Sequence, residues 1–352
     1  MNKHLSYILP VFLVAILYFG GQYAYTHYAY LVDITLPIAA VILVGLHINV
    51  VRFISELNQK QQIRKQFGTY LSPDLVAQLQ RQPELLVLGG ESRELSIMFT
   101  DVRGFTTISE HYGKDVQGLT RIMNRYMTAM TKKILENKGT LDKYIGDAQM
   151  AFWNAPLDNG QHAKDAVKTA LQMMESLNEF NREITTEGVP PFGMGLGINT
   201  GTVVVGNMGS DQRFDYTCMG DSVNLASRLE GQSKPYGVGI VLGSRTAELV
   251  RDEYPVVELD KIAVKGKTEG VNIFTVLRNP KFNPADLEIH DTMLSLYREK
   301  KFDGAIKFCH TLKGCFNSEL DHYYDLWEQR CEEMKKIKLP ADWDGTFVAN
   351  TK

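Results

Sequence analysis

Two aspartates stand where a protein commonly holds a divalent cation. Asp101 ends an alternating run that begins at Glu94, and Asp147 follows Gly146 in a short turn. Carboxylates bind hard cations such as Mg²⁺ and can hold them against a triphosphate. Gly104 adds a turn whose backbone amides can approach phosphate oxygens, because glycine has no side chain to obstruct them. Each of these features taken alone is also typical of an ordinary turn.

A second polar pair, Asn224 and Arg228, lies in a segment that predicts a helix over residues 222–230, with Asp221 as its N-cap. Residues four positions apart share one face of a helix, so both side chains can project toward one ligand. The planar guanidinium of Arg228 suits the geometry of an oxyanion. A solvent-exposed pair on a surface helix is the alternative.

The segments around these residues alternate between strand and helix periodicity. Apolar residues recur every second position from Leu95 to Phe99, as in a strand, and every third or fourth position in two later amphipathic stretches. The order βαββαβ predicts an α+β, ferredoxin-like fold with extra strands beyond it. The expected elements are a strand at 94–101, a helix at 115–137, a hairpin of 140–145 and 148–153 turning at Gly146-Asp147, a helix at 162–183, a strand at 194–199, a glycine-punctuated hairpin at 201–209, a strand at 214–219 and further strands to Leu277.

Composition is uneven along the chain. Between Lys3 and Arg52 the only formally charged residue is Asp33. Residues 5–21 and 34–51 are each long enough to cross a bilayer as a helix. Lys3 precedes the first segment, and several lysines and arginines follow the second, starting at Arg52. The positive-inside rule therefore places both ends of the pair and the following domain in the cytoplasm. The sequence therefore predicts a multi-pass protein of the inner (cell) membrane, and a cleaved signal peptide is the alternative for the first segment.

The remaining composition excludes other classes. The net charge is -3 and charged residues make up 22%, so no nucleic-acid partner is expected. The four cysteines, in no CxxC pair, predict neither a zinc site nor a disulfide framework. We expect four regions: a transmembrane hairpin at 1–51, a linker with signalling helices at 52–90, a catalytic domain at 91–278 and a helical C-terminal tail at 279–352. The linker is equally readable as a helix that pairs two chains or as a solvated connector. The tail predicts two helices, at 286–312 and 319–336, and packing is the favoured role of its Trp343 segment.

Three segments occur in order: Phe99-Thr-Asp-Val-Arg-Gly-Phe-Thr106, Asp142-Lys-Tyr-Ile-Gly-Asp147 and Tyr216-Thr-Cys-Met-Gly-Asp-Ser-Val-Asn-Leu-Ala-Ser-Arg228. Together they closely resemble the signatures of class III nucleotide cyclases. The resemblance covers about residues 93–278, and Val264-Lys265-Gly-Lys267 resembles the family's phosphate-contacting loop.

The resemblance implies a role for each matching residue. Asp101, Asp147 and the backbone of Val102 would hold two divalent ions, Mg²⁺ or Mn²⁺, in a two-metal clamp. Arg228 would stabilise charge on the α-phosphate, and Asn224 would position the ribose. The implied substrate-binding residues are Lys143, Thr217, Lys265, Gly104, Phe105 and Thr106.

Two of these positions bear on the nucleobase. The ammonium of Lys143 can donate to adenine N1, whereas guanine N1 carries a proton and needs an acceptor. Thr217 can accept from the adenine amino group, and counting back from Gly220 places Thr217 rather than Cys218 at this position. The sequence therefore predicts ATP as substrate and an adenylate cyclase. As plain structural residues, Lys143 would be an exposed strand lysine and Thr217 a β-branched strand former.

The resemblance further implies a homodimer. In the family, the metal aspartates come from one subunit and the base-selecting residues, with Asn and Arg, from the other. This chain carries both sets, so two head-to-tail copies would form two equivalent sites. The alternatives are a guanylate cyclase and a catalytically silent signalling scaffold that retains the fold.

Overall fold

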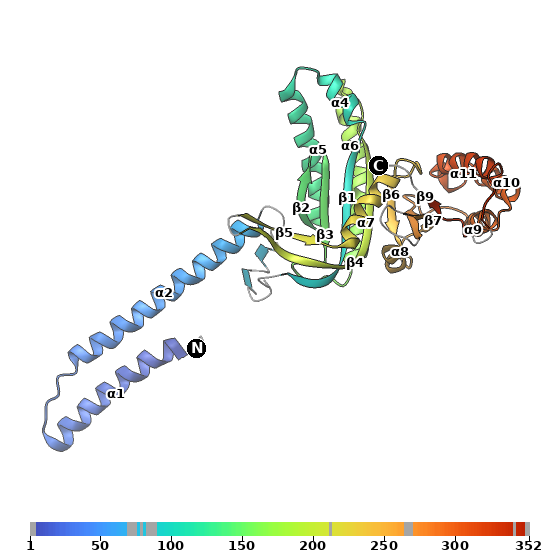
Figure 1. Ribbon diagram of the computed structural model, residues 1–352. Helices are drawn as coiled ribbons and strands as arrows, with labels where there is room; N and C mark the ends of the chain where they lie inside the picture. The colour runs from blue at the N-terminus through green and yellow to red at the C-terminus, as the bar shows by residue number, and fades with distance from the viewer. Residues whose placement is uncertain are drawn as a thin grey trace. The chain divides into compact units, whose positions relative to one another are not determined.

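The computed structural model describes residues 5–68, 76–77, 80–81, 90–210, 213–263, 270–340 and 343–348 (Figure 1). The chain forms two compact units, Met1–Thr69 and Tyr70–Lys352. Much of the second half of the expected linker, residues 69–75, 78–79 and 82–89, lies outside the described residues.

The first unit is a pair of helices, α1 (Leu5–Tyr28) and α2 (Thr35–Phe67). Their stretches Leu9–Tyr28 and Thr35–Gln61 are long and apolar enough to cross a membrane by length and composition. α1 extends beyond the expected end at residue 21, and α2 runs on through the polar residues after Arg52 without a break. The helices approach closely at Gly45, where a Cβ would lie 3.1 Å from the Cγ of Pro10.

The second unit contains a mixed sheet that starts with the expected βαββαβ order. Within the described residues nine strands pair in the order β2-β3-β1-β4-β6-β8-β7-β9, and β5 pairs with β4. β1 (Glu91–Arg103) lies between β3 and β4 and is antiparallel to both. The elements of this ferredoxin-like part are α4 (Phe105–Tyr112), α5 (Val116–Glu136), β2 (Thr140–Ile145), β3 (Ala148–Trp153), α6 (His162–Thr186) and β4 (Gly193–Ser210). The α+β fold class is confirmed.

Each face of the sheet supports its own hydrophobic core. One core packs α5, α6 and the short helix α8 (Ser244–Val250) against the strands. The other contains α7 (Asp221–Gln232), the outward faces of β6 (Ile240–Gly243), β7 (Val256–Ala263) and β8 (Val271–Val276), and the C-terminal helices. Side chains alternate between the cores along β6, since Ile240 and Leu242 join the first and Val241 the second.

The sequence misplaced one turn. The residues expected to form a hairpin at 201–209 belong to β4, an uninterrupted strand of 18 residues. It pairs with β1 as far as Val205 and with β5 (Arg213–Met219) from Val204 to Ser210, so ladder hydrogen bonds bridge the glycines. The antiparallel pairing of β4 with β5 therefore extends as far as Ser210 and Arg213.

The C-terminal region was also predicted incorrectly in detail. The expected helix at 286–312 is two helices, α9 (Pro284–Arg298) and α10 (Phe302–Leu312). They are separated where Lys300 takes a positive φ of 64°, which ends a right-handed helix. α11 (Asp321–Met334) follows, and β9 (Phe347–Val348) pairs with β7.

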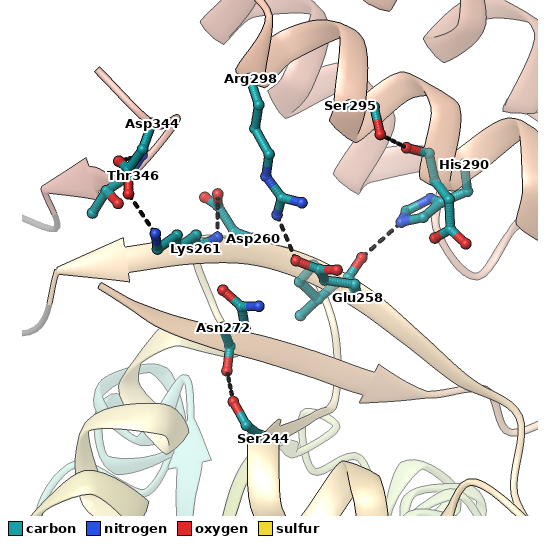
Figure 2. A network of polar contacts seen from close by, with 12 residues as sticks. Ser244, Glu258, Asp260, Lys261, Asn272, His290, Ser295, Arg298, Asp344 and Thr346 are labelled. Atoms are coloured by element: carbon teal, nitrogen blue, oxygen red, sulfur yellow. Dashed lines mark hydrogen bonds and ion pairs between the residues drawn. The ribbon is translucent and has the colours of Figure 1, made fainter. Parts of the chain in front are cut away.

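These C-terminal helices are docked on β7 through polar as well as apolar contacts (Figure 2). Arg298 donates to the Glu258 carboxylate at 2.5 Å, and His290 Nε2 lies 2.6 Å from the Glu258 carbonyl. Lys261 pairs with Asp344. Trp343 packs edge to face on Tyr297, with ring centroids 5.2 Å apart. Trp343 thus packs on the C-terminal helices, in keeping with the favoured prediction for its segment.

At the centre of this junction lies a buried ion pair between Arg330 of α11 and Asp260 of β7. The hydroxyl of Tyr236 and the amide of Lys261 also donate to Asp260. The guanidinium of Arg330 lies 3.9 Å from the ring centroid of Phe347. Because each polar atom of the carboxylate has partners, the buried charges are compensated.

Candidate active site

The two candidate metal ligands lie at the ends of neighbouring strands. Asp101 is near the end of β1, opposite Gly195 of β4. Asp147 lies in the two-residue turn that joins β2 to β3, where Gly146 takes a φ of 67° that favours glycine. The hairpin and its turn are where the sequence predicted them.

The electrostatics of Asp101 show that these carboxylates are close. Burial and the negative charge of Asp147 both raise the pKa of Asp101, and the backbone amide of Val102 opposes them. In the part of the chain that the structure describes, no lysine or arginine forms an ion pair with either carboxylate. Two mutually repelling oxygen-donor groups fit a hard divalent cation.

This pair does not form a complete metal cage. No group of three or more His, Cys, Asp or Glu side chains among the described residues could hold a metal ion. Mg²⁺ characteristically uses one or two carboxylates and takes its other ligands from water and substrate phosphates. The donor set therefore suits an ion that takes its remaining ligands from water and from the phosphates of a substrate, and the Val102 backbone stays a predicted further ligand.

The turn after Asp101 is built for close approach of an anion. Gly104 has a φ of 77° and is the N-cap of α4, which begins at Phe105. A Cβ at Gly104 would meet no atom within 4 Å, so the backbone there faces open space. The amides of Phe105 and Thr106 belong to the first turn of α4, where backbone N–H groups have no partner within the helix.

Glycines in β4 bring α7 into direct contact with the sheet. A Cβ on Gly197 would lie 2.1 Å from the backbone nitrogen of Glu230 and 2.4 Å from the carbonyl of Ala226. Only glycine permits this approach. Asn224 and Arg228 lie on the same helix; Asn224 is exposed and Arg228 is half-buried. The helix was predicted, but Gly220 rather than Asp221 is its N-cap, and Asp221 lies in its first turn.

The structure brings some predicted site residues together and leaves others apart. Among the described residues, no hydrogen bond or ion pair joins Asn224 or Arg228 to Asp101 or Asp147. Lys143 and Thr217, in contrast, meet at a common partner, Asp142. The Thr217 hydroxyl donates to Asp142 Oδ2 at 2.5 Å, and Lys143 Nζ lies 3.3 Å from Asp142 Oδ1.

Asp142 is a residue to which the sequence alone assigned no role. It sits in a β-bulge, because Leu141 faces Ala151 and Lys143 faces Met150, the next residue of β3. Its side chain is fully buried, whereas 42% of the Lys143 side chain is exposed. The only available signal in the sequence was its position next to Lys143.

Two further groups near the carboxylates were missed. Burial, with the charges of Asp101 and Asp147 and against that of Arg103, raises the pKa of Glu230 to about 7. Burial and the same two aspartates raise the pKa of Tyr126, whose hydroxyl is buried without a hydrogen-bond partner. Lys265 lies outside the described residues, so its predicted phosphate contact has no structural description.

Known proteins resemble the second unit. The family model of the adenylate and guanylate cyclase catalytic domain matches residues 89–277. Adenylate cyclase 1 of Rhizobium meliloti is 36% identical over 185 residues, covering 53% of this chain and 28% of that protein. An adenylate cyclase of Anabaena cylindrica is 38% identical over 195 residues, covering 53% and 37%. The matched region thus spans about a third of these relatives.

Two crystal structures show the same similarity. The adenylyl cyclase CyaB from P. aeruginosa is 35% identical with a TM-score of 0.52, and the match covers 55% of this chain and 98% of that one. The guanylyl cyclase Cya2 is also 35% identical, with a TM-score of 0.50, covering 54% and 94%. The family model spans more than half of the chain, so this protein belongs to the adenylate and guanylate cyclase catalytic-domain family.

Proposed function

We propose that the protein is an adenylate cyclase that converts ATP to 3′,5′-cyclic AMP and pyrophosphate. The observation that carries the choice of ATP is the pairing of Lys143 and Thr217 around Asp142. Lys143 can only donate, which matches the unprotonated N1 of adenine and opposes the N1–H of guanine. The Thr217 oxygen can accept from the adenine amino group.

The reaction requires the ribose 3′-oxygen to bond to the α-phosphorus while the bond to the β-phosphate oxygen breaks and the 3′-hydroxyl proton is released. Two divalent ions, Mg²⁺ or Mn²⁺, bound by Asp101, Asp147 and the Val102 carbonyl would lower the pKa of that hydroxyl and neutralise phosphate charge. Arg228 donates to the α-phosphate oxygens, and Asn224 bonds to the ribose. The amides from Gly104 to Thr106, together with Lys265, contact the phosphates.

The two sets of residues would meet between two copies of the chain. The absence of described contacts between the aspartates and the Asn224–Arg228 pair favours this arrangement. Apolar side chains are also exposed on each copy in two places that could face the other copy. Tyr144 and Ile145 lie on the edge strand β2, and Val204 and Met219 are cross-strand neighbours on β4 and β5. Such side chains outside a core are typical of an interface.

Mixing two inactive variants tests the composite site. Asp101→Ala and Arg228→Ala homodimers should each be nearly inactive, because each lacks one essential group in both sites. The mixture should recover activity, since a heterodimer has one site with both groups intact. Failure of the mixture to recover, with heterodimers present by differential tagging, would contradict the dimer.

A guanylate cyclase is the competing function, because Cya2 matches this fold as well as CyaB does. The assay is cyclic-product formation by the full-length protein with Mn²⁺ and either ATP or GTP. We expect a higher kcat/KM for ATP. A preference for GTP would overturn the proposed substrate, and no product from either nucleotide would favour a silent scaffold.

We further propose that α1 and α2 anchor the protein in the inner (cell) membrane, with the catalytic domain, residues 91–278, in the cytoplasm. The support is their length and apolar composition together with the basic residues that follow the second span. The full-length protein should stay in the membrane pellet after alkaline carbonate extraction. Its release into the supernatant would contradict an integral anchor.

A further inference from the structure

We infer that Asp142 is a specificity-determining residue that fixes Thr217 as a hydrogen-bond acceptor and thereby selects adenine. The inference rests on the proposed function and deepens it. It starts from the geometry of one hydroxyl, since Thr217 could by itself either donate or accept.

A threonine hydroxyl has one proton and two acceptor sites. The Thr217 proton is directed at Asp142 Oδ2, 2.5 Å away. An ionised carboxylate has no proton to give back, so the bond has one polarity. The Thr217 oxygen can then only accept from a ligand. The 6-amino group of adenine donates and fits this arrangement, whereas the 6-oxo group of guanine would need a donor.

The surroundings of Asp142 hold this polarity in place. The β-bulge places its side chain against β5, and the carboxylate is fully buried. Burial is the largest influence and leaves the pKa of Asp142 raised above its ordinary value, while the Thr217 hydroxyl, the charge of Lys143 and the backbone amide of Cys218 lower it in part. The polarity of the bond rests on geometry, since Thr217 Oγ1 donates to Asp142 Oδ2 and Lys143 Nζ lies 3.3 Å from Asp142 Oδ1. The same carboxylate is the ion-pair partner of Lys143, although its Oδ1 has no hydrogen-bond partner, so one buried group contacts both predicted base-reading side chains.

Asp142 could instead be a purely structural link that keeps β5 on the sheet. Phe152 and Tyr216 already contact each other there, with ring centroids 6.1 Å apart. The two roles predict different kinetics. Loss of a structural link lowers kcat/KM for ATP and for GTP by the same factor. Loss of the group that fixes the direction of the Thr217 hydrogen bond changes the ratio of the two kcat/KM values.

The test is the Asp142→Asn variant of the full-length protein. The amide is nearly isosteric but can donate to Thr217, which frees the threonine proton for guanine. We expect the ATP:GTP ratio of kcat/KM to fall about tenfold or more, the size typical of one mispaired polar group. Asp252→Asn is the matched control, because Asp252 is an exposed partner of Lys164 far along the chain; its ratio should equal that of the parent.

A double-mutant cycle tests the route of the effect. In a Thr217→Val background no hydroxyl remains, so Asp142→Asn should change the ratio by less than about twofold. A ratio unchanged by Asp142→Asn in the parent would overturn the inference while leaving adenylate cyclase activity intact. Displacement of a fluorescent ATP analogue by ATP and by GTP measures the corresponding ratio of the two dissociation constants, which should shift in the same direction. It tests Asp142 even if the parent forms no cyclic product, the result that would refute only the proposed function.

Discussion

The acidic side chains in two regions of the sheet differ in whether they have cationic or hydrogen-bond partners. At the β1–β3 end, Asp101 and Asp147 are neighbouring carboxylates without a described cationic partner, and their repulsion helps to raise the pKa of Asp101. At the β7 end, the buried Asp260 receives donors from Arg330, Tyr236 and Lys261. Both regions are acidic, but only the second is electrostatically complete within one chain.

This difference suggests that the Asp101–Asp147 region is suited to binding a ligand and the Asp260–Arg330 region to stabilising the fold. An incomplete set of buried or half-buried charges costs folding free energy, which a bound cation or substrate can recover. A complete set orders the chain and leaves nothing for a ligand to satisfy. The C-terminal helices therefore act as part of the fold, whereas the open carboxylates lie where we propose that the ions bind.

The largest expected effect is on catalysis. Asp147→Asn should reduce the proposed ATP cyclisation at least 100-fold, because one of the two carboxylates that we propose to hold the ions is lost. In chelator the variant should unfold at the same temperature as the parent or higher, since the repulsion with Asp101 is relieved. Cyclic AMP formation and thermal unfolding with and without Mn²⁺ measure both effects. A large loss of metal-free stability would show that the carboxylate is structural.

Removing one partner of the buried Asp260–Arg330 ion pair should instead lower stability more than activity. Arg330→Met leaves Asp260 buried and unpaired, which should lower the free energy of unfolding by about 3 kcal/mol or more. Denaturant titration measures this change. The double variant Asp260→Asn, Arg330→Met removes the stranded charge and should recover part of the loss. If Arg330→Met alone is neutral, the junction is not the electrostatic support described above.

His290 makes the junction sensitive to acid. Complete burial lowers the pKa of His290 to about 4, and its Nε2–H donates to the Glu258 carbonyl while its Nδ1 accepts from Tyr324. The folded state resists protonation that the unfolded state accepts, so this contribution is present above pH 6.5 and is lost as pH falls toward 4. At 1.36 kcal/mol per unit the loss is at most roughly 3 kcal/mol. The difference in free energy of unfolding between the parent and His290→Gln should become smaller as pH falls from 6.5 to 4, which denaturant titration at several pH values measures.

The smallest effect concerns Glu230 beside the open carboxylates. Its pKa is raised to about 7, so the fold favours its neutral form. This contribution is present below pH 4.5 and is lost as pH rises from 4.5 to 7. In chelator, Glu230→Gln should gain on the parent by roughly 2 °C in Tm between pH 5 and pH 8, a modest shift because the side chain is partly exposed. A constant difference across pH would mean that Glu230 is ionised throughout.

The chain's local patterns were enough to predict much of this molecule. Periods of two and of 3.6 located β1, α5, the β2–β3 hairpin and α6, and Gly146 marked the turn that carries Asp147. Local patterns failed where long-range pairing decides. β4 continues through its glycines because β1 and β5 supply ladder partners on either side. Beyond the break at Lys300, α10 returns against α9, where a Cβ on Gly304 would lie 3.1 Å from Leu296.

The sequence by itself determined the types of groups available: a carboxylate near the end of a strand, another in a hairpin turn, an ammonium at Lys143, a hydroxyl at Thr217, and an Asn and Arg one helical turn apart. Tertiary structure alone decided which of them meet. Asp142 lies 75 positions from Thr217, yet the bulge in β2 and the path of β5 join them. Side-chain identity fixes the number of donors and acceptors, but the direction of a hydrogen bond depends on a partner that only the folded chain brings near.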